Sequence, residues 1–228
     1  MSEKNEEARE AVLGRVRSRL GVRGDEPGRR GLVHSRLRTH PANLIPECAQ
    51  RPKGELARLL QTMLEKNGAR TIRVRTLKGI PEAVASALRE NNLPSRVRVG
   101  EDVIFEGLRA EPGVLELLSG PAEATDAIGL SHAFAAAAET GTLFLHSGPD
   151  NPSTLNFLPE NHFVLVLTSD IAGSYEECWN KLRSTNARGE IPRTVNLISG
   201  PSRTADIEQT IVMGAHGPRN LVVFIAGS

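Results

Sequence analysis

Cysteine is scarce in this chain: its 228 residues include two cysteines, Cys48 and Cys178, and no Cys-x-x-Cys motif. A four-iron, four-sulfur cluster takes four ligands, so the chain cannot hold one with its own thiolates. A zinc site built on cysteine pairs is excluded for the same reason, and no two histidines have helical ligand spacing, so no metal site is expected. Two isolated cysteines suit a reducing compartment, and we expect a cytoplasmic location.

Aromatic residues are also few, at 4% of the chain. Bases stack on aromatic side chains, so nucleic-acid binding is not expected. No run of about 18 apolar residues occurs, which predicts no membrane span, and the acidic first ten residues differ from a secretory signal. The dinucleotide-binding signature Gly-x-Gly-x-x-Gly does not follow any strand-like segment, so redox chemistry would need a cofactor held elsewhere.

Charge is distributed unevenly, although the net charge is only +1. Residues 1–110 contain 22 Lys and Arg against 14 Asp and Glu, a net +8, whereas residues 111–228 contain 6 against 13, a net −7. The basic half fits solvated helix faces, on which arginines and acids are interspersed. It also fits docking to an acidic partner or to a second copy of the chain, as in a homo-oligomer.

Two regions are predicted, residues 1–54 and residues 55–228. Apolar residues recur every fourth position between 3 and 20, as in an amphipathic helix, and residues 21–54, rich in Arg, Pro and Gly, look like an extended arm. The second region alternates between helix and strand patterns. Helices are predicted at 55–67, from Pro81 onward, and at 132–138, 175–183 and 205–213; strands at 71–76, 96–99, 114–118, 126–131, 142–146, 162–168, 195–198 and 221–226. This order predicts an α/β fold, an open and mostly parallel sheet with helices on both faces.

Residues 200–208, GPSRTADIE, follow one predicted strand and open the last predicted helix. Free N–H groups and the positive end of the helix dipole at such a turn favour an anion. Gly200 and Ser202, Arg203 and Thr204 are therefore candidate binding residues, with the Arg203 guanidinium suited to a carboxylate or phosphate. The alternative is simple helix capping by Ser202 or Thr204.

Four segments together resemble the lactate-utilisation (LUD) domain family: AETGTL at 138–143, LPENH at 158–162, GPSRTADIE at 200–208 and GAHGP at 214–218. Their order and spacing match that family across roughly residues 55–228, and without cluster cysteines the chain most resembles its small, cluster-free members. The resemblance implies a fold of the sugar-phosphate isomerase and CoA-transferase type. It also implies a role beside two iron–sulfur partner proteins in the oxidation of L-lactate to pyruvate.

Glu139, Thr140, Gly141 and Thr142 form a second candidate loop. In the CoA-transferases that the resemblance brings in, a glutamate before a glycine in a comparable loop is the nucleophile, and Glu139 could serve so here. The alternative is a carboxylate bonded to nearby backbone, with Gly141 at a positive φ. We prefer the alternative, because a Glu-Thr-Gly triplet is common.

His162 and His216 lie where loops meet apolar segments, and either could act as a general acid–base. A structural hydrogen bond is the favoured interpretation of His162, while His216, in a tight polar loop, stays open to both. Asn156 could orient a ligand, or could belong to a turn.

These patterns predict a cytoplasmic component of an iron–sulfur L-lactate oxidation system. The chain itself would bind no cofactor and would hold a small anionic ligand, with the iron–sulfur clusters on its partners. Two alternatives remain: a CoA-transferase-like or isomerase-like enzyme that uses Glu139 on a small carboxylate or phosphate, and a binding protein that senses such an anion.

Overall fold

The computed structural model describes residues 3–109, 115–185, 191–207 and 210–227. Its contacts divide the chain into two units, Met1–Leu44 and Ile45–Ser228.

The first unit contains two helices, α1 (Glu3–Leu20) and α2 (Pro27–Thr39). The helix predicted at 3–20 is confirmed, whereas the extended arm predicted from 21 onward is wrong for residues 27–39. Pro27 occupies the first helical turn, where its fixed φ favours a helix and its missing N–H costs nothing. His40 then ends α2 in the left-handed conformation, with φ at 46°.

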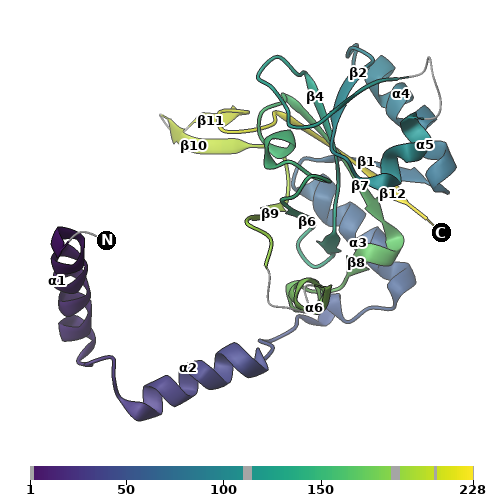
Figure 1. The fold of residues 1–228 in the computed structure, drawn as a ribbon. Helices are drawn as coiled ribbons and strands as arrows, with labels where there is room; N and C mark the ends of the chain where they lie inside the picture. Colours follow the sequence, from purple (N-terminus) through teal and green to yellow (C-terminus); the bar gives the residue numbers. More distant parts are fainter. Residues whose placement is uncertain (1–2, 110–114, 186–190, 208–209, 228) are drawn as a thin grey trace. The chain divides into compact units, whose positions relative to one another are not determined.

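A six-stranded parallel sheet forms the centre of the second unit (Figure 1). Its strand order is β1-β12-β7-β4-β2-β3, and every neighbouring pair is parallel. The strands are β1 (Arg70–Val74), β2 (Arg96–Val99), β3 (Glu116–Ser119), β4 (Ile128–His132), β7 (Asn161–Leu167) and β12 (Asn220–Ala226). The predicted strands at 71–76, 96–99, 126–131, 162–168 and 221–226 are confirmed with small shifts of their ends; Val114, in the strand predicted at 114–118, lies outside the described residues.

Both faces of this sheet are covered, which explains why β7 and β12 are apolar along their length. Alternate residues of these strands, such as Phe163 and Phe224, pack with α4 (Ile80–Glu90) and α5 (Glu106–Arg109). The intervening ones, such as Val164 and Val223, pack with α3 (Lys53–Lys66) and a second sheet. The predicted α/β class, an open parallel sheet with helices on both faces, is therefore confirmed.

The second sheet has the order β8-β5-β6-β9. Its strands are β5 (Ala135–Ala137), β6 (Thr142–His146), β8 (Ile171–Ala172) and β9 (Val195–Ile198), and α6 (Tyr175–Thr185) packs against it. The β6 and β9 pair is antiparallel, so these two predicted strands are confirmed but lie outside the parallel sheet. The helix predicted at 132–138 is wrong: β4 ends at His132, and the four alanines at 135–138 are fully buried between the layers. Close packing of small side chains here outweighs the helix propensity of alanine.

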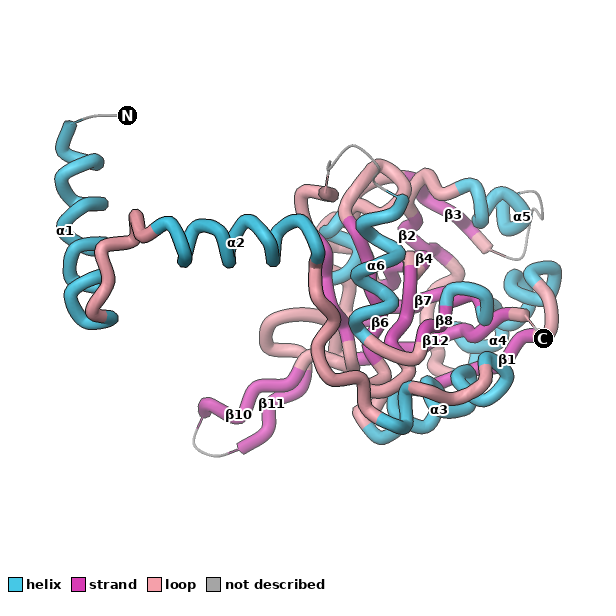
Figure 2. Tube along the Cα trace, turned by 90° about the horizontal axis from the view of Figure 1, so that it is seen from below, coloured by secondary structure: helices cyan, strands magenta, loops and turns pink. Residues whose placement is uncertain are grey.

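The helix predicted at 205–213 is also wrong. The chain forms an antiparallel hairpin there, β10 (Arg203–Ile207) and β11 (Thr210–Met213), which extends from the rest of the unit in both views (Figure 1, Figure 2). Thr204 pairs with Val212 in its register. The segment is rich in β-branched residues, which favour strands.

Candidate functional site

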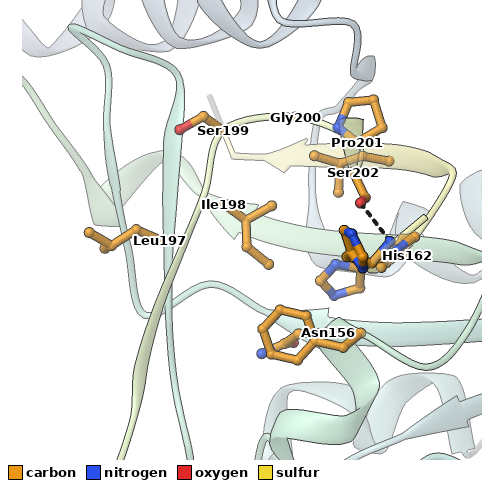
Figure 3. Close-up of a pocket in the computed structure, with 13 residues that line it drawn as sticks. Asn156, His162, Leu197, Ile198, Ser199, Gly200, Pro201 and Ser202 are labelled. Atoms are coloured by element: carbon orange, nitrogen blue, oxygen red, sulfur yellow. Dashed lines mark hydrogen bonds between the residues drawn. The ribbon is translucent and has the colours of Figure 1, made fainter. Parts of the chain in front are cut away.

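A pocket of about 200 Å³ lies at the amino ends of β7 and β12 (Figure 3). Its floor includes His162, the second residue of β7, and Leu221, the second residue of β12. Two further walls come from the segment after β9 and from the loop before β12. The lining residues are Asn156, Phe157, His162, Leu197, Ile198, Ser199, Gly200, Pro201, Ser202, His216, Gly217, Pro218 and Leu221.

Two glycines let the walls approach closely. A Cβ on Gly129 of β4 would lie 2.7 Å from the carbonyl oxygen of Leu155, so only glycine lets the short helix η4 (Ser153–Asn156) sit against that strand. A Cβ on Gly200 would lie 2.6 Å from the carbonyl oxygen of Asn67, at the end of α3. These contacts hold Asn156 and the 200–202 segment in place around the pocket.

A buried hydrogen-bond relay joins three side chains at this site. Ser131 Oγ lies 3.1 Å from Asn156 Oδ1 and 3.0 Å from His162 Nε2. All three residues are at most 1% exposed. Burial lowers the pKa of His162 to about 3, so the imidazole is neutral at physiological pH.

Each end of the relay keeps one polar atom without a partner. Asn156 Nδ2 and His162 Nδ1 are buried and have no hydrogen-bond partner among the described residues. Both side chains line the pocket. Unpaired buried polar atoms are costly, and these two belong to residues of the pocket wall.

Ser202 organises the open side of the pocket. Its N–H donates to the carbonyl oxygen of Pro218 at 2.8 Å, and its own carbonyl accepts from Gly214 N–H at 2.8 Å. The backbone N–H of His216 donates to Ser202 Oγ at 3.4 Å, the bond drawn in Figure 3. The described lining residues include no Lys, Arg, Asp or Glu, so only His216 can add a cationic group.

Arg203 and Thr204 lie on β10 rather than at a helix N-terminus, which corrects the predicted anion site. Arg203 is exposed and does not line the pocket. Its guanidinium lies beside Gly68, where a Cβ would come within 2.5 Å of Nη2. That position is just beyond the carboxyl end of α3, where the helix dipole favours a cation without any bound anion.

The second candidate loop is the tight turn between β5 and β6, not a helix-to-strand connection. Gly141 has φ at 69°, and a Cβ there would lie 2.7 Å from Leu64 N, so glycine is needed both for conformation and for packing on α3. Glu139 Oε1 accepts the N–H of Tyr175, the first residue of α6, at 2.7 Å. This is the backbone-bonded carboxylate preferred from sequence.

Thr142 connects this turn to the pocket. Its Oγ1 lies 2.7 Å from Thr140 Oγ1, 2.6 Å from the Tyr175 hydroxyl and 2.7 Å from Ser199 Oγ. Ser199 belongs to the pocket lining, but its side chain points away from Asn156 and His162 in Figure 3. The hydroxyl cluster therefore supports the rim of the pocket from outside.

A separate charged network lies at the opposite edge, where β4 and β7 end. His132 Nδ1 lies 2.8 Å from Asp102 Oδ2, and Lys181 Nζ lies 2.6 Å from both Asp170 Oδ1 and the Phe134 carbonyl oxygen. Burial raises the pKa of Asp102, but hydrogen bonds from His132 and a backbone N–H outweigh it and hold that pKa below its ordinary value. Within the described ranges, no three His, Cys, Asp or Glu side chains gather as a metal site.

Five of the residues proposed from sequence meet in one place: the pocket brings together Asn156, His162, Gly200, Ser202 and His216. It excludes Glu139, Thr140, Gly141, Thr142, Arg203 and Thr204 from its lining. Sequence reasoning missed Ser131, whose one available signal is a hydroxyl in the otherwise apolar run before His132.

In the described part of the chain, no helix has the length and apolar character to cross a membrane.

Comparison with known proteins gives partial matches to curated relatives. An uncharacterised protein of Neisseria meningitidis is 46% identical over 96 residues, which cover 42% of this chain and 40% of that protein. Proteins named lactate utilization protein C are 36% identical over 104 residues in Halalkalibacterium halodurans (45% of each chain) and 34% identical over 92 residues in Bacillus subtilis (40% of this chain, 38% of that protein). The aligned segments thus span less than half the length of these relatives.

The fold also matches a solved structure. A DUF162 family protein of Deinococcus radiodurans superposes with a TM-score of 0.58 at 21% identity, covering 78% of this chain and 99% of that one. The LUD domain model matches residues 57–226, which include both sheets and every residue of the pocket. The chain therefore belongs to the LUD domain family.

Proposed function

We propose that this chain is a cytoplasmic component of a lactate-utilisation system, in which it binds a small carboxylate and leaves electron transfer to iron–sulfur partner proteins. The observation that carries this proposal is the pocket at the amino ends of β7 and β12, whose wall residues Asn156 and His162 each keep a buried nitrogen without a partner among the described residues. Its volume of about 200 Å³ suits a ligand of a few carbon atoms. The relatives named lactate utilization protein C support lactate as that ligand.

The cysteines support placing the redox centres on other proteins. The chain has two, and a four-iron cluster takes four. Burial, and then the neighbouring Glu177 carboxylate, raise the pKa of the Cys178 thiol to about 12. A thiol with that pKa stays protonated at neutral pH, and the thiolate is the form that binds metals.

The ligand's carboxylate belongs at the open side of the pocket. The buried end has no cationic side chain among the described residues, and a carboxylate there would lose its hydration without a charged partner. The Ser202 hydroxyl and the His216 imidazole can donate hydrogen bonds to it at the mouth. This placement replaces the anion site first predicted at Arg203.

The test is a native pull-down of the tagged protein from lactate-grown cells, with the visible absorbance and lactate-dependent dye reduction of the eluate measured. A brown, active eluate with cysteine-rich partner proteins is expected. A colourless eluate without partners would contradict the subunit role, and lactate oxidation by the isolated apo-protein would contradict the placement of the redox centres.

The two alternatives make different predictions. A Glu139 nucleophile would form a glutamyl adduct that hydroxylamine traps, whereas the bond from Tyr175 N–H favours a capping role. A sensor would bind its anion tightly without turnover and without partners.

A further inference from the structure

A second and larger hollow adjoins the pocket at the amino edge of the parallel sheet. Its volume is about 550 Å³, and its walls come from the segment after η4, the end of β11 and the loop before β12. Phe157, His216 and Gly217 line both hollows, so the two share a wall. We call this second hollow the outer groove; Leu158 and Met213 line it and do not line the pocket.

Exposed apolar side chains are concentrated around these two hollows. The described residues of the second unit expose eight large apolar side chains, and four of the eight line the pocket or the outer groove. These four are Phe157, Leu158, Leu197 and Met213, and the other four are Leu77, Val103, Ile191 and Val212. Single apolar residues on a surface are ordinary, but a cluster of them beside a cavity marks an interaction site.

The charged residues of the outer groove pair with each other. Glu160 Oε1 lies 3.9 Å from Arg219 Nη1, and both side chains are 64% exposed. The apolar members are Phe157, Leu158 and Met213, at 45%, 49% and 37% exposure. Protein interfaces have the same composition, with aromatic and Met side chains at an apolar centre and charged residues at a polar rim.

The oxidation proposed for the ligand indicates what covers this surface. Conversion of a 2-hydroxy acid to a 2-oxo acid releases two electrons and two protons. The chain has two cysteines, too few to hold a four-iron cluster, so the electrons must pass to a group on another protein. The reacting carbon is bonded to the carboxylate that we place at the pocket mouth. Because electron transfer slows steeply with distance, the acceptor must dock beside that mouth.

We propose that the outer groove is the docking surface for the iron–sulfur protein that accepts these electrons, and that this partner lays an apolar segment against Phe157, Leu158 and Met213. The inference rests on the proposed function for the identity of the partner, and on the exposed apolar side chains for its position. Two clusters take one electron each, and the two protons pass to water. Docking there also covers the pocket mouth, because His216 and Gly217 border both hollows.

Leu158→Asp and Met213→Asp test this surface. Both side chains are partly exposed and neither lines the ligand pocket, so each variant is expected to fold and to bind L-lactate as the natural chain does. A carboxylate in the apolar centre of an interface is costly, so capture of the cluster protein is expected to fall by about tenfold or more. The readout is a native pull-down from lactate-grown cells, measured as cluster absorbance and lactate-dependent dye reduction per mole of tagged chain.

Leu77→Asp is the matched control. Leu77 is 45% exposed, against 49% for Leu158, and belongs to the short helix η2 (Leu77–Gly79) that follows β1 at the opposite, carboxyl edge of the sheet. This variant is expected to capture the cluster protein as the natural chain does. Thermal unfolding and calorimetry with L-lactate, on all three variants, distinguish lost docking from a damaged pocket.

A second measurement identifies the occupant directly. A photoreactive benzophenone side chain in place of Leu158 is expected to crosslink to a protein whose peptides contain cluster-ligating cysteine motifs, as read by mass spectrometry. The same group in place of Leu77 is expected to give no such product. A crosslink from position 158 to a protein without such cysteines would overturn the proposed occupant.

The other outcomes separate docking from the subunit role. Equal capture by the natural chain and both groove variants would overturn the docking surface alone. Loss of capture in Leu77→Asp as well, or loss of L-lactate binding in the groove variants, would also overturn it, because neither effect is specific to docking. A natural chain that captures no cluster protein would overturn the subunit role together with the surface. An isolated chain that is a dimer, and that Leu158→Asp makes monomeric, would show a second copy in the groove and overturn the iron–sulfur partner as its occupant.

Discussion

The Glu139 carboxylate accepts a 2.7 Å hydrogen bond from the backbone N–H of Tyr175, and so holds the first turn of α6 against the β5–β6 turn. This carboxylate supplies an acceptor at the end of a helix where N–H groups lack partners. The neighbouring backbone bond from Glu139 N–H to the Gly173 carbonyl, at 3.0 Å, fixes its position.

Glu139→Ala is therefore expected to lower the free energy of unfolding by about 1 kcal/mol, as loss of a helix cap does. Glu139→Gln keeps a side-chain oxygen for Tyr175 and is expected to cost less. Urea denaturation measures both. If Glu139→Gln abolished lactate-dependent activity of the complex at unchanged stability, the capping role would be insufficient and the nucleophile role favoured.

Protonation of His162 is expected to limit stability in acid. Burial lowers its pKa to about 3 from an ordinary value of 6.5, so below pH 6.5 the unfolded chain binds a proton that the folded chain does not. Above pH 6.5 this proton does not affect the free energy of unfolding. As the pH falls from 6.5 toward 3, the free energy of unfolding falls by about 1.4 kcal/mol per pH unit. Urea midpoints at several pH values between 7 and 4.5 measure this slope.

His162→Gln should reduce the slope of the unfolding free energy against pH by the equivalent of one bound proton, about 1.4 kcal/mol per pH unit. This holds whatever the effect of the substitution on stability at pH 7. His34→Gln, at an exposed position of α2, is the control and should keep the slope of the natural chain. Equal slopes in all three proteins would show that the folded chain protonates His162 as readily as the unfolded one.

Gly200→Ala is expected to damage the pocket. The new methyl group would lie 2.6 Å from the Asn67 carbonyl oxygen, so the 200–202 segment must move away from α3. We expect a loss of about 1–3 kcal/mol of stability, together with weaker lactate binding. Gly148→Ala meets no atom within 4 Å and should change neither quantity, so similar effects of the two substitutions would contradict this explanation.

The two thiols should differ in reactivity. Cys178 is fully buried with its pKa raised to about 12, whereas Cys48 is partly exposed. Iodoacetamide at pH 8 is expected to alkylate Cys48 in the folded protein, and both residues only after unfolding. Mass spectrometry of tryptic peptides gives the answer, and rapid native alkylation of Cys178 would show that α6 opens readily.

The parallel sheet could be predicted because its strands are long apolar runs bounded by turns, as at 162–168 and 221–226. The errors fall where local propensity and packing disagree. The alanines at 135–138 form a helix in most settings, but here all four side chains are fully buried in and next to strand β5. At 205–213, the polar residues after Ser202 imitate a helix start, while the β-branched residues beyond them form a hairpin.

The pocket was predictable only in part. Four of its residues lie in or next to the segments that carry the family resemblance: Asn156, His162, Ser202 and His216. Polar residues at such positions are natural candidates for a site. Ser131 lies outside these segments. A serine inside an apolar strand can be assigned to the site only when its neighbours on the adjacent strand are known. Likewise, the position of Arg203 beside Gly68 depends on a turn 135 positions earlier in the chain.

Helix α6 contacts both the hydroxyl cluster beside the pocket and the charged network at the carboxyl edge of the parallel sheet. Its Tyr175 hydroxyl contacts Thr142, which supports the pocket rim through Ser199, while Lys181 contacts Asp170 at the carboxyl edge of the parallel sheet. Lys181 lies six positions after Tyr175, about 9 Å along a helix that is too short to bend appreciably. A displacement of α6 along its axis would therefore disturb its contacts with Thr142 and with Asp170 together, so the rim of the pocket and the charged network depend on one short helix.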